Sequence, residues 1–235
     1  MHRKSLVATS VAALVVSAAA VAVPLEAAAA PSPTSVVVRV EGVDRTLLAP
    51  TAAHTHTGWI TTGGTPVGKC PATSAAGALD VATHHDWTGK YSASIGGLFL
   101  NAIRGETQDN KTYYWSVWID NRYASKGVCD LKLHAGDTLL FAPDAIRHHE
   151  HPIGIEGPAA VTVGHSFTVK VLRFSDAGVP KPLAGATVTT ANAVVGQTNR
   201  HGVLTIVAKH AGTLVLRAAE SGYIRAAPVR VGVSG

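Results

Sequence analysis

The sequence predicts a mainly β protein whose first domain is α+β and whose second domain is a β-sandwich. Short runs rich in Val, Ile, Thr, Tyr and Trp alternate at period two and end at Gly, Asn or Asp along most of the chain. One Ala-rich segment, residues 73–83, has the composition of a helix. All four Trp and four of the five Tyr precede residue 150, so composition divides the chain in two.

The first domain is predicted to combine one helix with a small sheet. Strands are expected at residues 35–42, 45–48, 91–95, 97–103 and 113–119, and as two short runs within 131–141. Residues 54–68 hold five Thr and four Gly and predict a loop. In the helix, Thr73 or Ser74 is expected to cap the exposed amides. Gly77 is expected to weaken the helix by about 1 kcal/mol relative to Ala.

The clearest strand, residues 113–119, carries the candidate ligand-binding residues. Tyr113, Trp115, Val117 and Ile119 share one face of the strand, and Tyr114, Ser116 and Trp118 share the other. The Asp-Asn pair that follows tolerates the left-handed backbone of a tight turn, which predicts a hairpin. Aromatic side chains on a sheet face serve ligand binding and protein contacts alike. Tyr114, Trp118 and Tyr123 therefore form either a ligand-binding face or part of the core, whereas Trp115 is assigned to the core.

Residues 1–29 are expected to be a signal peptide. Arg3 and Lys4 precede an apolar run, and Ala27-Ala28-Ala29 offers a small-residue cleavage site. The alternative is an uncleaved membrane anchor, which the Ala-rich run with its Thr and Ser residues disfavours. The mature chain is therefore expected to be secreted, with no stable membrane anchor after cleavage.

Cys70 and Cys129 are the only cysteines in the sequence. Two cysteines in an exported chain predict one disulfide. A metal site would need further soft ligands nearby, and a redox pair would normally have C-x-x-C spacing. Closing a loop of about 59 residues is worth roughly 4 kcal/mol in the chain-entropy model.

Histidine is unusually frequent, with twelve in the chain. Residues 144–152 are bounded by proline and predict a linker between the domains, and this linker contains His148, His149 and His151. Imidazole is the commonest metal ligand, but a zinc site needs three or four converging ligands. The main interpretation is solvated histidine without a specific metal site. The alternative is a metal binder that uses these three side chains.

Residues 153–235 resemble a bacterial immunoglobulin-like domain. Strands are expected at residues 160–163, 166–174, 186–190, 194–198, 203–208, 213–218 and 227–233, with turn residues between them. In the second of these strands, Phe167, Val169 and Val171 alternate with polar residues, as one buried face requires. The resemblance implies a spacer or an adhesive module.

A predicted helix at residues 74–82 is followed by three short motifs. They are Trp115-x-x-Trp118-x-Asp120-Asn121-x-x-Ala124, then Gly127-Val128 with Leu133, and finally Gly136-Asp137-x-Leu139-x-Phe141. Together these features resemble the transcobalamin-like C-terminal domain family, assigned here to residues 30–143. The resemblance implies a β-grasp fold, in which a small curled sheet packs on a helix. In the transcobalamins the corresponding domain covers one face of cobalamin, and the cysteines here are placed like those of a secreted bacterial subgroup.

Several function classes are excluded by what the sequence lacks. The net charge of +5 comes from scattered basic residues, without the Lys/Arg stripe of a nucleic-acid groove. The sequence has no G-x-S-x-G elbow, no spare cysteine and no phosphate-binding glycine loop. We therefore expect that the protein is not an enzyme and binds no cofactor. The predicted function is a secreted, non-catalytic binding or display protein of the cell envelope, with a recognition head, a spacer and an unknown extracellular ligand. The alternatives are a binder of a small cobalamin-like molecule and a His-mediated metal binder.

Overall fold

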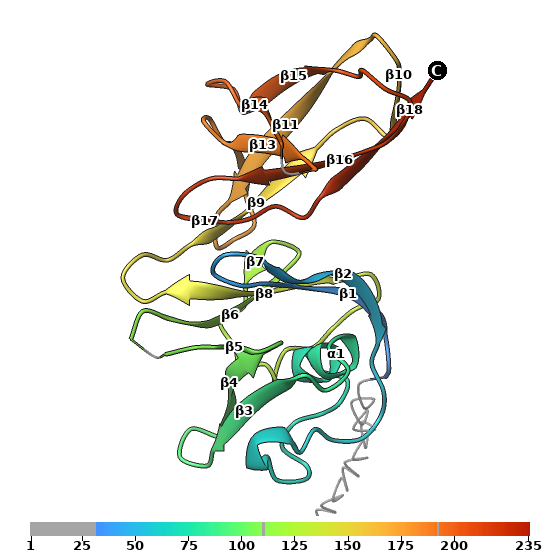
Figure 1. The fold of residues 1–235 in the computed structure, drawn as a ribbon. Helices are drawn as coiled ribbons and strands as arrows, with labels where there is room; N and C mark the ends of the chain where they lie inside the picture. Colours follow the sequence, from blue (N-terminus) through green and yellow to red (C-terminus); the bar gives the residue numbers. More distant parts are fainter. Residues whose placement is uncertain (1–31, 110, 192) are drawn as a thin grey trace, which may run out of the picture. The chain divides into compact units, whose positions relative to one another are not determined.

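The structure is a computed structural model that describes residues 32–109, 111–191 and 193–235. The predicted signal peptide, residues 1–29, lies outside the described residues. By their contacts, residues Pro31–Gly235 form one compact unit, in which two sets of strands follow each other along the chain (Figure 1). No helix within the described ranges is long and apolar enough to cross a membrane.

The first set of strands forms a five-stranded sheet in the order β2-β1-β8-β6-β7. Its members are β1 (Ser35–Glu41), β2 (Thr46–His54), β6 (Tyr113–Ile119), β7 (Arg122–Tyr123) and β8 (Thr138–Ala145). β1 and β8 pair in parallel, and the other neighbours are antiparallel. β6 spans the predicted residues, and Asp120 and Asn121 take the expected left-handed turn, with φ of 49° and 60°.

A smaller sheet has the order β3-β4-β5. Its strands are β3 (Trp87–Ser92), β4 (Gly97–Ile103) and β5 (Glu106–Thr107), and a single 3-10 turn, η1 (Thr62–Gly64), precedes it. The strand predicted at 91–95 is shifted towards the N-terminus, because the following residues form the turn into β4, with Gly96 at a φ of 65°. The strand predicted at the start of 131–141 is wrong. Lys132 makes only an isolated bridge to Ser74, and no neighbouring strand pairs with this segment.

The helix α1 (Ala75–Ala82) packs against β1 and β2 (Figure 1). Ser74 is its N-cap residue, but the Ser74 side chain makes no capping hydrogen bond. The amide of Ala76 instead donates to the carbonyl of Val128 at 3.1 Å. The predicted side-chain cap is therefore wrong, because a tertiary contact satisfies the amide that the cap would have served.

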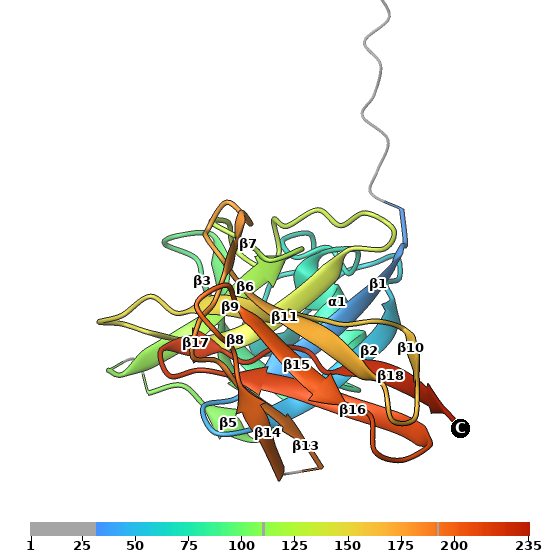
Figure 2. The ribbon, with the colours of Figure 1, turned by 90° about the horizontal axis from the view of Figure 1, so that it is seen from above.

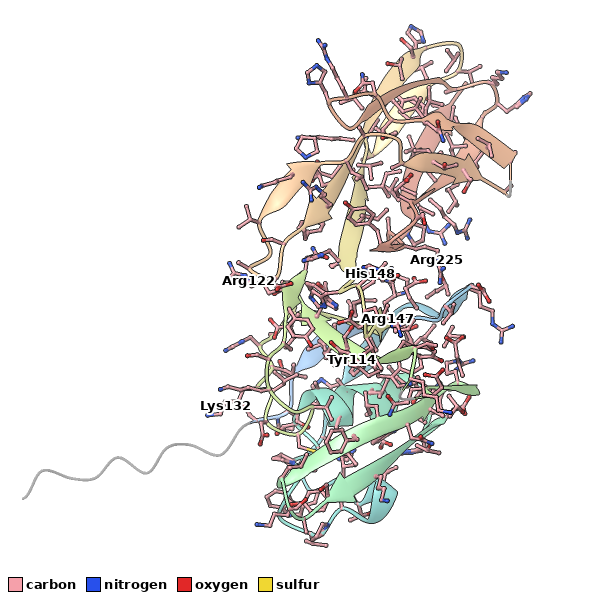
Figure 3. The ribbon with its side chains drawn as sticks, turned by 90° about the vertical axis from the view of Figure 1, so that its left-hand side faces the viewer. Tyr114, Arg122, Lys132, Arg147, His148 and Arg225 are labelled. Atoms are coloured by element: carbon pink, nitrogen blue, oxygen red, sulfur yellow. A yellow bond between two sulfur atoms is a disulfide. The ribbon has the colours of Figure 1, made fainter. Side chains whose placement is uncertain are left out.

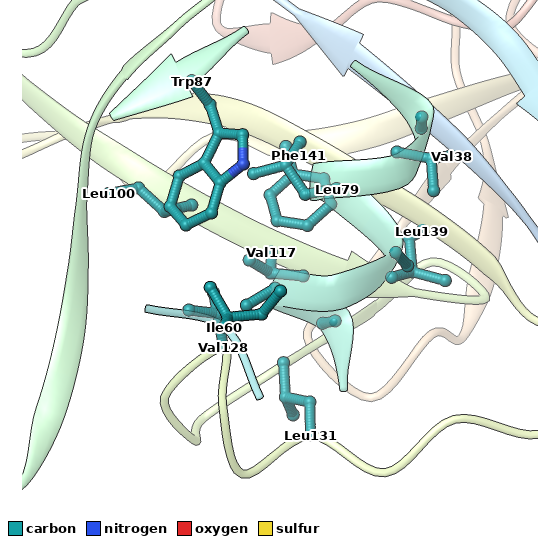
Figure 4. Packing of buried hydrophobic residues seen from close by; sticks show 14 of the residues in the cluster. Val38, Ile60, Leu79, Trp87, Leu100, Val117, Val128, Leu131, Leu139 and Phe141 are labelled. Carbon is teal, nitrogen blue, oxygen red and sulfur yellow. The ribbon is translucent and has the colours of Figure 1, made fainter. Parts of the chain in front are cut away.

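The core of the first set lies between α1 and the strands (Figure 4). Leu79 of α1, Val117 of β6 and Phe141 of β8 belong to one buried cluster. Cys70 and Cys129 lie in the same cluster and form the predicted disulfide, which joins the segment before α1 to the loop after β7.

The second set of strands forms two sheets whose side chains share one core. The sheet orders are β10-β18-β16-β13-β14 and β12-β11-β9-β17, and β15 pairs with β11 as well (Figure 2). The strands are β9 (His151–Glu156), β10 (Ala160–Thr162), β11 (Ser166–Phe174), β12 (Pro180–Pro182), β13 (Thr187–Thr190), β14 (Ala193–Gln197), β15 (Val203–Val207), β16 (Gly212–Ala219), β17 (Tyr223–Ile224) and β18 (Val229–Ser234). Val171, Leu216 and Val231 come from different strands and are buried together. The mainly β character of the chain is confirmed, whereas the β-grasp and immunoglobulin-like assignments stay predictions.

Residues 144–152, predicted as a linker, include the end of one strand and the start of another. β8 continues to Ala145 and β9 begins at His151. β9 pairs with β11 on one side and β17 on the other, although Pro152 and Gly154 lower its strand propensity. The local sequence does not predict this strand, because pairing with two neighbours outweighs local composition.

Candidate functional site

The three predicted ligand-binding residues lie together at the β6–β7 hairpin. Tyr123 of β7 is opposite Trp118 of β6, and their ring centres are 5.2 Å apart. Tyr114, labelled in Figure 3, donates its hydroxyl hydrogen to Asp144 Oδ2 at 2.9 Å, and its oxygen lies 3.4 Å from the hydroxyl of Tyr123. The structure therefore unites the three residues in one cluster.

Trp118 is buried and does not present a ligand-binding face. Its exposed fraction is 0%, and it packs with Leu140, Ala142 and Ile224. The cause is the strand register, because β8 places Leu140 directly opposite Trp118 while Ile224 of β17 completes the cluster. The sequence leaves open whether Trp118 is part of a ligand-binding face or part of the core. In the structure Trp118 is part of the core.

Tyr114 and Tyr123 both line a groove that runs along β4 and β6. The groove has a volume of about 480 Å³, which falls within the usual range for small-molecule sites. Its lining is mostly apolar and aromatic and includes the exposed side chain of Phe99. Gln108 and Lys126 add polar groups. The groove is therefore suited to a ligand that is partly apolar and partly polar.

The groove is lined by aromatic and aliphatic side chains together with serine hydroxyls, one amide and one lysine. The residues that line it include no carboxylate, imidazole or thiol. Burial, followed by the hydrogen bonds with Tyr123 and Asp144, raises the pKa of the Tyr114 hydroxyl, which therefore stays neutral. The groove can hold and orient a ligand through its rings, an amide and one ammonium group.

Two histidines of the predicted linker lie against the buried side of this aromatic cluster, which sequence analysis did not predict. The His149 ring stacks on Trp118 with ring centres 5.5 Å apart and planes at 20°. The His151 ring lies 5.8 Å from Trp118 in a tilted arrangement. His149 Nδ1 is 2.6 Å from Asp144 Oδ2, and His149 Nε2 is 2.9 Å from Asp176 Oδ1.

The sequence holds little signal for this second arrangement. Asp144 is the penultimate residue of β8, and Asp176 lies in the turn after β11, where the sequence pattern indicates only a turn. His148 stays exposed at the turn between β8 and β9 (Figure 3). Two histidines from the other histidine-containing segments contact neighbouring side chains outside this cluster. His54 forms a hydrogen bond with Ser35, and the imidazole of His85 contacts the carboxylate of Asp80.

The carboxylates around His149 raise the pKa of its imidazole. Burial disfavours protonation, but the hydrogen bond with Asp176 and the negative charge of Asp144 outweigh it and raise the pKa of His149. Burial, and then the charge of Asp144, also raise the pKa of the neighbouring Glu150, while Arg225 partly opposes this rise.

A second cavity, of about 350 Å³, is lined in part by Glu41 and Arg225. The Arg225 guanidinium already donates to Glu41 Oε2 at 3.1 Å and to the carbonyls of Gly42 and Val43 at 2.6 and 2.9 Å. Arg39 donates to the other oxygen of Glu41 at 2.8 Å. These structural contacts use Glu41 and Arg225, two of the three charged side chains of this cavity, and none of the predicted ligand-binding residues lines it. The groove along β4 and β6 is therefore the stronger candidate site.

A family model described as "Domain of unknown function (DUF4430)" matches residues 76–144. These residues contain the β6–β7 hairpin and much of the groove lining. Among solved structures, the chain is similar to haptocorrin in complex with Cbi, at 15% sequence identity and a TM-score of 0.37. That match covers 50% of this chain and 26% of the other, so this chain spans about a quarter of the haptocorrin chain. No curated protein matches the sequence.

Proposed function

We propose that this protein is an exported, non-catalytic binding protein. Residues 30–143 recognise a ligand, and residues 153–235 carry that part as a spacer. The observation that carries the proposal is the groove of about 480 Å³ along β4 and β6, which two of the three predicted ligand-binding residues line. A concave site of this size, with aromatic walls and few polar groups, is the usual form of a small-molecule site.

The lining of the groove defines the class of ligand. Phe99, Tyr114 and Tyr123 offer aromatic surface to a flat or partly apolar molecule. Gln108 can both donate and accept a hydrogen bond, and Lys126 supplies a positive charge. The ligand is therefore a small molecule with an apolar face and an amide, hydroxyl or anionic substituent. A corrinoid-like molecule, which the resemblance to the transcobalamin-like family suggests, has these properties.

Two features support an exported protein that binds without catalysis. The disulfide between Cys70 and Cys129 suits an oxidising compartment. The groove lining contains no histidine, carboxylate or thiol, so the serine hydroxyls in it have no neighbouring imidazole or carboxylate in the lining to act as a general base.

The spacer role rests on the contrast between the two surfaces. In the described residues beyond 152, Phe167 is buried, and Phe174 and Tyr223 are only partly exposed. This part therefore offers little of the aromatic surface that dominates binding sites. Its compact two-sheet core suits a module that positions its neighbour.

The test is a titration of the oxidised chain lacking residues 1–29 with cobalamin, by calorimetry and tryptophan fluorescence together. We expect one cobalamin per chain and quenching of fluorescence, because Trp115 lines the groove. Tyr123→Ala should weaken binding at least tenfold, the effect of losing about 1.4 kcal/mol. Trp59→Ala removes an exposed aromatic ring outside the groove and should leave the affinity unchanged.

Two results would count against this proposal. Absence of heat and of fluorescence change in a folded sample would exclude a corrinoid ligand and favour display of a surface that contacts a macromolecule. Tight binding that Tyr123→Ala leaves intact would place the ligand outside the groove.

A further inference from the structure

Three electron-pair donors meet beside the buried face of Trp118. Asp176 Oδ1 lies 2.9 Å from His149 Nε2 and 3.1 Å from His151 Nε2. The three potential ligand atoms lie within 4.8 Å of one another. Over residues 32–109, 111–191 and 193–235, this is the one group of three or more such side chains that could hold a metal ion.

Asp144 fixes which nitrogen of His149 faces this meeting point. Its carboxylate is completely buried and can only accept hydrogen bonds, which come from the Tyr114 hydroxyl at 2.9 Å and the Glu150 amide at 3.1 Å. His149 Nδ1, at 2.6 Å from Asp144 Oδ2, must therefore carry a hydrogen. The lone pair of a neutral His149 is then on Nε2 and points at Asp176. Two electron-rich atoms at that distance require a cation between them, either a proton or a metal ion.

The side chains are held in place before any ion arrives. The buried ring of Trp118 supports His149 and His151, and Tyr123 packs edge-on against His149 with ring centres 4.8 Å apart. The carbonyl of Asp176 accepts a hydrogen bond from the amide of Tyr123 at 2.9 Å, which anchors the turn after β11 to the hairpin. Sites with this kind of support lose little conformational entropy on binding.

We propose that His149 Nε2, His151 Nε2 and an Asp176 carboxylate oxygen form a site for a divalent transition-metal ion of the zinc class. A tetrahedral zinc with bonds of about 2.0–2.1 Å keeps its ligand atoms roughly 3.4 Å apart. The two contacts of Asp176 need to open by only a few tenths of an ångström to reach that spacing. The hydrogen bond from His149 Nδ1 to the buried Asp144 carboxylate is the outer-shell partner that metal-bound histidines usually have.

The site keeps one side open to solvent. The side chains of His149 and His151 are 32% and 34% exposed, and that of Asp176 is 62% exposed. Three protein ligands leave a fourth position for water or for a group of another molecule. This metal site goes beyond the proposed groove function. Its three ligand residues do not line the groove, so either proposal can fail alone.

The experiment is a zinc titration of the oxidised chain lacking residues 1–29, by calorimetry and by competition with a coloured chelator. Cobalt is the spectroscopic probe, because its visible absorption reports nitrogen and oxygen coordination. We expect one ion per chain, with affinity lowered at least tenfold in His149→Gln, His151→Gln and Asp176→Asn. His148→Gln is the matched control, since His148 belongs to the same tract and stays outside the cluster. It should bind as the unaltered protein does.

Asp176→Asn is the decisive variant, because its exposed side chain can be changed without disturbing the core. A melting curve and near-ultraviolet circular dichroism confirm the fold of each variant. Failure of the unaltered protein to bind zinc or cobalt would overturn the proposal. So would unchanged affinity in folded Asp176→Asn, or an equal loss in His148→Gln, which would mean loose binding by the histidine tract. Cobalamin titrations run in parallel keep failure of the groove distinct from failure of the metal site.

Discussion

The two sets of strands are stabilised by cores of different composition. The first packs a helix, large aromatic rings and a disulfide into its core. The second buries mainly Val, Leu, Ile and Ala between two sheets and has no cross-link, since the only two cysteines lie in the first. The first also leaves residues 55–74 without a strand, apart from isolated bridges.

This difference shows where a cross-link is needed. A loop-rich segment contributes few ladder hydrogen bonds, so the first set gains from restricting its unfolded chain by other means. In the second set, regularly spaced strands supply backbone pairing almost throughout. The loop after β7 in the first set also contributes to the lining of the groove along β4 and β6.

Among the changes considered, removing the disulfide should cause the largest loss of stability, and the loss should fall on the first set. Cys70→Ser combined with Cys129→Ser frees a separation of 59 residues, and we expect a loss of about 4 kcal/mol in the free energy of unfolding. Urea unfolding followed by tryptophan fluorescence measures this loss, because all four Trp lie in the first set. A change below about 1 kcal/mol would show that packing alone holds the loop segment.

A matched pair of leucines sharpens the comparison. Leu79 of α1 and Leu216 of β16 are both completely buried, and each change to Ala should cost about 3 kcal/mol. The packing of Ile224 on Trp118 and the Arg225 hydrogen bonds join the two sets. We therefore expect Leu216→Ala to move the fluorescence transition as well. A transition left in place, with a separate shift in circular dichroism, would show two independent unfolding units.

The smallest effect concerns the contact between the two sets at His149. Its raised pKa means that protonated His149 adds stability below about pH 6.5, which is lost as the pH rises through the raised value. With a third of the side chain exposed, the loss in metal-free protein should be less than about 1 kcal/mol. Melting temperatures across this pH window, with and without His149→Gln, measure it. Identical pH profiles for the two proteins would contradict the expectation.

Local patterns predicted the elements whose own residues decide them. The β6 strand, its Asp-Asn turn, the disulfide and the long β11 strand all occur where the sequence places them. Elements decided by distant partners were missed. β9 contains a proline and a glycine and exists because β11 and β17 pair with it.

Gly77 illustrates the same limit in energetic terms. Propensity alone treats it as a weak point of the helix. In the structure, a Cβ at this position would overlap the carbonyl of Ala72, so the glycine is what allows the helix to approach the preceding loop. Nothing in the local pattern contains that information, because it depends on how the chain folds back.

The candidate sites divide in the same way. Alternation along β6 predicted that Tyr114 and Trp118 share a face, and only the register with β8 determined that Trp118 is buried. The segment around Asp176 has the composition of an ordinary turn, and nothing in it predicts a contact with His149. Its place beside His149 depends on the packing of the turn after β11 against Tyr123.

The parallel strand pairs have a mechanical consequence. β1 pairs in parallel with β8 in the first set, and β10 pairs in parallel with β18 in the second. Tension applied between residues 35 and 234 would draw the two strands of each pair in opposite directions along their own axes. The hydrogen bonds of a pair would then share the load in shear instead of opening one after another. A chain connected in this way resists pulling through its slow rate of forced unfolding, a property that equilibrium stability does not report.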